Sequence, residues 1–150
     1  MNSVISATTG SVSGAPSRLG KSGNFLATAE SLLRSAQVYL EQGKLDLALE
    51  YAYRAALRVA GAVNADSPVI KKRKRLPSSA WQRLALTGVS GQKWAAEFEQ
   101  YSTLRGRVAS GIVTSPNREV VERVFSLAAE FYAEVFYGDS LPENGVVSAA

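Results

Sequence analysis

Two long amphipathic segments joined by a single glycine constrain the fold of this chain more than any other feature. In residues 24–42 and again in residues 44–63, apolar side chains recur at steps of three and four, the period of one face of an α-helix. The second stripe is rich in alanine, which lets a neighbouring helix approach closely. Gly43 tolerates the left-handed conformation of a helix C-terminus, so one helix ends there and the next begins. The sequence therefore predicts an antiparallel helical hairpin.

Three further helices are predicted after the hairpin. Their spans are residues 79–87, 91–108 and 115–138. Asn24, Ser90 and Ser115 are the predicted N-caps, because each side chain can accept a hydrogen bond from a backbone amide of the first turn. Residues 64–77 are predicted to be a loop. With no convincing strand, the pattern indicates an all-α protein, an antiparallel bundle of five helices.

The chain length of 150 residues predicts a single domain. Residues 1–23 consist mainly of serine, glycine, threonine and alanine, and they are predicted to be a disordered tail because they cannot bury enough apolar surface to fold. Residues 139–150 are predicted to form a second loose tail, which leaves residues 24–138 as the folded bundle. Trp81 and Trp94 lie at helical spacing to other apolar residues, so we expect them in the core rather than on a base-stacking surface.

The chain contains no histidine and no cysteine, which excludes many kinds of site. Disulfides, thiol nucleophiles, zinc fingers, histidine metal sites and imidazole acid–base catalysis are all ruled out. Among the side chains that remain, only a cluster of carboxylates could bind a metal ion. The acids of the last helix are expected to form a solvent-facing surface instead; they are Glu119, Glu122, Glu130 and Glu134. We therefore expect no metal, no cofactor and no catalytic residue.

Basic residues are concentrated in the middle of the chain. The whole chain carries +4, whereas residues 67–111 hold nine basic and two acidic residues, a net +7. Such asymmetry favours an anionic partner, either nucleic acid or another negative surface. The residues predicted to contact nucleic acid are Lys71, Lys72, Arg73, Lys74, Arg75, Arg105 and Arg107. Two alternatives stay open: the run at 71–75 as a solvated linker, and the last two arginines as partners of a helix dipole.

The cellular location of the protein is predicted from features that the sequence lacks. No run of 18 apolar residues and no secretory signal are visible, so no membrane contact is expected. The absence of cysteine fits a reducing compartment, and we expect the protein in the cytoplasm.

The hairpin resembles a tetratricopeptide helix pair. The resemblance lies in residues 43–51 and in Ala55, seven residues after Ala48. No second copy follows 34 residues later, and one unit cannot bury its own face, so a repeat array is not expected.

The wider layout is similar to a HEPN domain, in particular to a small actinobacterial branch of that superfamily. The similarity covers residues 24–138. It rests on residues 29–33, Ala48, Tyr51, Ala52 and Ala55 of the hairpin, on the basic run, and on the helix at 118–138. This resemblance implies a helical bundle that often dimerises. Many members of the superfamily are metal-independent RNases in toxin or defence systems, so the resemblance also implies this activity. The catalytic motif of these members is an arginine followed, after four to six residues, by a histidine.

The chain departs from that motif because it has no histidine. With Arg105 in the arginine position, Ser110 takes the histidine position, and a serine hydroxyl cannot serve as the usual acid or base near neutral pH. We therefore expect a non-catalytic HEPN-like domain that binds nucleic acid or a nucleotide, in a toxin, defence or nucleic-acid-processing context. The expected partners are RNA or another polyanion, a second copy of the chain, and a protein. The alternative is a protein–protein adaptor that uses the face of Tyr51 and Tyr53.

Overall fold

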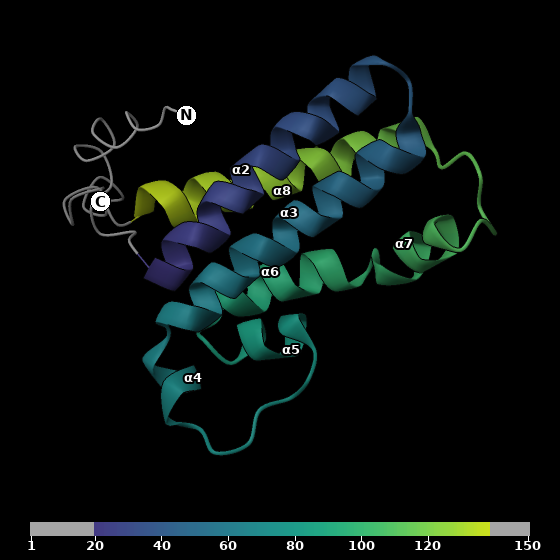
Figure 1. The fold of residues 1–150 in the computed structure, drawn as a ribbon. Helices are drawn as coiled ribbons and strands as arrows, with labels where there is room; N and C mark the ends of the chain where they lie inside the picture. Colours follow the sequence, from purple (N-terminus) through teal and green to yellow (C-terminus); the bar gives the residue numbers. More distant parts are fainter. Residues whose placement is uncertain (1–19, 139–150) are drawn as a thin grey trace, which may run out of the picture.

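The computed structural model describes residues 20–138, and within them every regular element is a helix (Figure 1). The helices are α2 (Gly20–Glu41), α3 (Leu45–Asp66), α4 (Pro68–Lys72), α5 (Ala80–Ala85), α6 (Val89–Glu99), α7 (Ser102–Ala109) and α8 (Arg118–Gly138). The all-α prediction is confirmed for this range. The predicted tails lie outside the described residues, except that residues 20–23 form the first turn of α2.

The predicted hairpin of α2 and α3 is confirmed. Gly43 has a φ of +75°, which is the left-handed conformation expected of it. Its amide donates to the carbonyl of Leu40 at 3.1 Å, and the amide of Lys44 donates to the carbonyl of Tyr39 at 2.9 Å. These two bonds satisfy carbonyls that the end of α2 would otherwise leave without partners.

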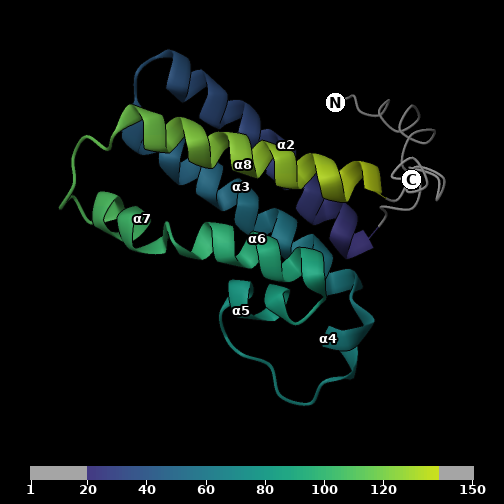
Figure 2. The same ribbon diagram turned by 180° about the vertical axis from the view of Figure 1, so that it is seen from behind.

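Helix α3 is the centre of the bundle. Helices α2 and α8 lie along one side of it, and the segment from α5 to α7 lies along the other (Figures 1 and 2). Its alanines make this possible, because side chains this small let several helices approach the same axis. Ala48, Ala52, Ala55, Ala56, Ala60 and Ala62 are all completely buried.

An aromatic stack fills the larger part of the core. Phe98 is fully buried, and its ring centroid lies 5.1 Å from that of Trp81, 6.0 Å from Trp94 and 5.8 Å from Phe131. The two tryptophans are only 5 % and 3 % exposed, which confirms them as core residues. A second apolar cluster lies nearer the Gly43 turn, and Tyr101 packs against both clusters.

The three predicted N-caps are wrong. Helix α2 begins at Gly20, so Asn24 lies within the helix and not at its end, and Ser22 of the first turn is buried. Helix α6 begins before Ser90, whose hydroxyl donates to a distant carboxylate instead of accepting from its own helix. The N-cap of α8 is Asn117, which accepts from a first-turn amide at 3.1 Å, and not Ser115.

Two predicted spans also need correction. The expected loop 64–77 contains the last turn of α3 and the short helix α4, which Ser67 caps and Pro68 opens. The expected helix 91–108 is divided into α6 and α7. At the division, the hydroxyl of Ser102 donates to the carbonyl of Glu99 at 3.0 Å, and such a local bond competes with continuous helix hydrogen bonding. No helix of residues 20–138 is long and apolar enough to cross a membrane.

Candidate nucleic-acid interface

The basic run forms an exposed arm between α4 and α5, which we call the basic arm (residues 71–75). Lys71 and Lys72 lie on the last turn of α4, and the backbone of Arg73, which ends that helix, is extended. All five side chains are exposed to solvent. The arm thus presents five adjacent positive charges on a loop that projects from the bundle (Figure 1).

Both ends of the basic arm are anchored to the bundle. Before it, the Ser67 hydroxyl accepts the amide hydrogen of Ile70 at 3.3 Å, and the Ile70 side chain is buried. After it, Nε of Arg83 donates to the carbonyl of Pro77 at 2.6 Å, and Ser79 caps α5. These contacts fix the points where the arm leaves and rejoins the bundle, and the solvated-linker alternative stays open for the five exposed side chains.

Two adjoining cavities lie beside the arm, and we call them together the basic groove. Their volumes are about 380 and 150 Å³, and Lys21 and Phe25 line both of them. Arg83 lines the larger cavity and Arg58 the smaller one. Among the described residues that line the groove there is no Asp or Glu, so its charge is wholly positive.

The residues that flank the arm connect it to the groove. Ile70 and Ser78, which flank the arm in sequence, both lie in the wall of the larger cavity. The cations of the arm and the groove are Lys21, Arg58, Lys71, Lys72, Arg73, Lys74, Arg75 and Arg83. Sequence reasoning missed three of them, Lys21, Arg58 and Arg83, because isolated cations on three different helices give no local signal.

The structure does not bring Arg105 and Arg107 to the basic arm. Both lie on α7, and Figures 1 and 2 show α7 well separated from α4. The Arg105 guanidinium forms two hydrogen bonds with the carboxylate of Glu50, at 2.9 and 2.8 Å, and lies 5.0 Å from the centroid of the Tyr53 ring. Arg107 is exposed in the last turn of α7, where a helix dipole favours a cation.

The Glu50 carboxylate joins two helices. The hydrogen bond from Arg105 lowers the pKa of Glu50, burial opposes this, and Arg54 lowers the pKa further through its own bond at 2.8 Å. The same pair raises the pKa of Arg105, so both groups are charged at neutral pH. Glu50 therefore pairs with Arg54, four residues later on α3, and links α3 to α7 through Arg105.

Replacing Glu50 with glutamine should lower the free energy of unfolding by about 1–2 kcal/mol at neutral pH. A carboxylate whose pKa is lowered by folding adds stability above its ordinary pKa of 4.5, and that stability is lost as the pH falls through the lowered value. The difference between wild type and E50Q should accordingly shrink in urea unfolding between neutral pH and about pH 3. The exposed Glu130→Gln variant is the control. A difference between wild type and E50Q that stays constant over this range would contradict the assignment.

The alternative adaptor face is not available as predicted. Tyr53 is 2 % exposed, and its hydroxyl accepts a hydrogen bond from Nε1 of Trp81 at 2.7 Å; burial raises the pKa of Tyr53. Tyr51 is half-buried, with its ring edge-to-face against Tyr39 at 5.2 Å. A pair of exposed tyrosines therefore does not exist on this helix, while a protein partner and a second copy of the chain remain predictions.

The acids of α8 face solvent, as predicted. Glu119, Glu122, Glu130 and Glu134 are all exposed. Within residues 20–138, no three acidic side chains come close enough together to hold a metal ion. Ser110, five residues after Arg105, is exposed at the end of α7, and its hydroxyl donates to the carbonyl of Arg107 at 3.3 Å.

Comparison with known proteins gives one match. The model of the SAV_6107-like HEPN family matches residues 46–136, which is more than half of the chain. The matched range extends from the first turn of α3 almost to the end of α8, and so it includes the basic arm and α7. Neither the curated proteins nor the solved structures give a significant match.

Proposed function

The chain belongs to the SAV_6107-like HEPN family, and we propose that it binds RNA as a polyanion without cleaving it. The observation that supports the proposal is the exposed basic arm next to the basic groove, whose described lining includes Lys21, Arg58 and Arg83 and no acidic side chain. In this proposal the domain contributes binding, not hydrolysis, to a toxin, defence or nucleic-acid-processing context.

The arm and the groove would make different contacts with an RNA strand. The five exposed cations of the arm would contact phosphates, and such contacts position a strand without reading its sequence. The groove offers the Phe25 ring between cations, a combination of aromatic and basic groups that suits single-stranded nucleic acid. Affinity should therefore depend strongly on salt and weakly on sequence.

The absence of the RNase motif supports the proposal that the domain does not cleave RNA. No histidine is present to move a proton at neutral pH. Arg105, in the position of the motif arginine, is engaged by Glu50 through both of its carboxylate oxygens. Labelled RNA should thus stay intact after incubation with the protein. Cleavage that disappears in the Arg105→Ala variant would show that the domain is an RNase.

Neutralising three lysines of the arm should weaken RNA binding strongly. For the triple variant Lys71→Gln, Lys72→Gln and Lys74→Gln, we expect a loss of roughly 100-fold near 50 mM salt. The slope of log affinity against log salt should fall by about 2, since each lost contact with a single strand removes about 0.7. The measurement is fluorescence anisotropy of a labelled single-stranded RNA over a series of salt concentrations.

A matched triple variant separates position from total charge. Lys44→Gln, Arg107→Gln and Arg123→Gln remove the same charge from exposed side chains on elements remote from α4. Thermal unfolding of both variants should stay close to wild type, because exposed substitutions usually change stability by less than about 0.5 kcal/mol. Equal losses in the two variants would show attraction by net charge alone. No binding by the wild type at low salt would refute the proposed function.

A further inference from the structure

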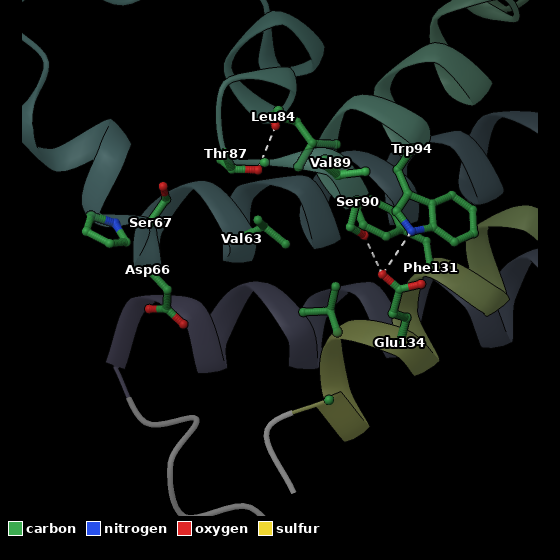
Figure 3. Close-up of a pocket in the computed structure, with 15 residues that line it drawn as sticks. Val63, Asp66, Ser67, Leu84, Thr87, Val89, Ser90, Trp94, Phe131 and Glu134 are labelled. Carbon is green, nitrogen blue, oxygen red and sulfur yellow. Dashed lines mark hydrogen bonds between the residues drawn. The ribbon is translucent and has the colours of Figure 1, made fainter. Parts of the chain in front are cut away.

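A third cavity, of about 480 Å³, lies where α3 and α8 end and α6 begins (Figure 3). Its walls are largely apolar side chains, which come from four helices; they include Val63, Leu84, Trp94, Phe131 and Val135. This volume is within the range of pockets that hold small molecules. The last turn of α3 separates it from the basic groove, because Asn64 and Ala65 line the groove whereas Val63 and Asp66 line this pocket.

Most hydrogen-bond donors among the side chains of this pocket already donate to acceptors of the protein. The Thr87 hydroxyl donates to the carbonyl of Leu84 at 2.7 Å. The Ser90 hydroxyl and Nε1 of Trp94 both donate to Oε2 of Glu134, at 2.6 and 3.2 Å, as the dashed lines in Figure 3 show. These groups leave lone pairs, not hydrogens, for a bound molecule.

The charge of the pocket is opposite to that of the basic groove. Of the described residues that line it, Asp66 and Glu134 are acidic and none is Lys or Arg. Oε1 of Glu134 accepts no hydrogen bond from residues 20–138, so it can accept one from a ligand. Because Ser90 ties Glu134 to the first turn of α6, the helix start already has the negative charge that it favours.

We propose that this pocket binds a small organic cation, an ammonium group attached to an apolar or aromatic body. The ammonium supplies three donors and a charge to lone pairs that include a carboxylate oxygen, and a charged donor and acceptor form the stronger type of hydrogen bond. The apolar body occupies the wall around Val63 and Phe131. An anion of the same size meets acceptors and a carboxylate, and binds much more weakly.

Two indole N–H groups report on this site and on an internal reference. The chain has two tryptophans: the Trp94 indole donates to Glu134 inside the pocket, whereas the Trp81 indole donates to Tyr53 in the core. In ¹H–¹⁵N spectra of the full chain, phenethylammonium should shift the Trp94 indole signal saturably and leave the Trp81 signal nearly unchanged. The anion 3-phenylpropanoate, which is similar in size, should bind at least about tenfold more weakly.

Substitution of the carboxylate completes the test. Glu134→Gln should weaken phenethylammonium binding by about tenfold, while Glu130→Gln, an exposed acid one turn earlier on α8, should leave it unchanged. An unchanged Trp81 signal shows that each variant is folded, and the comparison of the two probes on the wild type needs no variant. The proposal is overturned by the absence of a saturable Trp94 shift, by equal affinity for the anion, or by full affinity in E134Q.

Discussion

Truncation of Phe98 to alanine should lower the free energy of unfolding by about 3–5 kcal/mol, among the largest losses for a single core substitution. The side chain is completely buried, and its ring contacts three other rings, those of Trp81, Trp94 and Phe131. Removing it leaves a cavity between rings that are held on different helices and cannot close over it. The three aromatic pairs are lost as well, and such pairs add about 0.5–1.5 kcal/mol each beyond buried area.

Chemical denaturation followed by tryptophan fluorescence measures this loss directly, because both tryptophans contact Phe98. The matched control is Phe136→Ala. That ring is only half-buried at the edge of the same cluster, stacked on Tyr132 at 5.4 Å, and its loss should be clearly smaller. If the two variants lost equal stability, the stack around Phe98 would not be the centre of the core.

Gly91→Ala and Gly106→Ala should change stability in opposite directions, although both glycines lie inside helices. A Cβ at Gly91 would lie 2.2 Å from the carbonyl oxygen of Leu84 and 2.3 Å from Oγ1 of Thr87. Since the first of these is backbone, α5 and α6 must move apart, and we expect a loss of about 1–3 kcal/mol or more. A Cβ at Gly106 meets nothing within 4 Å, so alanine there should add about 0.5–1 kcal/mol by its better helix propensity.

Thermal unfolding of the two variants checks this pair of predictions. Each kcal/mol corresponds to a shift in Tm of roughly 4 °C for a domain of this size. The midpoint should fall for G91A and rise for G106A. A G91A protein as stable as the wild type would show that the junction of α5 and α6 is looser than the structure has it.

The elements with a strong repeating pattern could be predicted from sequence, and those decided by distant contacts could not. The hairpin follows from two apolar stripes and one glycine, which act locally. The start of α6 does not, because Ser90 is bound by Glu134, 44 residues later in the chain. At the division between α6 and α7, Tyr101 packs against both core clusters, a tertiary contact beside the local hydrogen bond of Ser102.

The candidate interface also has a part that could be predicted from sequence and a part that could not. The basic arm is visible in sequence because its five cations are adjacent. The basic groove is not, since Lys21, Arg58 and Arg83 meet only through the packing of α2, α3 and α5. Arg105 shows the opposite case, because it belongs to the same basic block of sequence, yet Glu50, 55 residues earlier, holds it on another part of the bundle.

The two anchors of the basic arm have a consequence for the entropy of binding. A flexible run of cations loses backbone freedom when it meets a ligand, at a cost of about 1–2 kcal/mol for each residue that becomes ordered. In this chain, the Ser67 cap and the Arg83 bond to the carbonyl of Pro77 restrict the arm as the bundle folds. If the arm binds RNA as proposed, part of that cost would fall on folding, where the buried core offsets it, and the RNA would meet an arm whose two ends are already fixed.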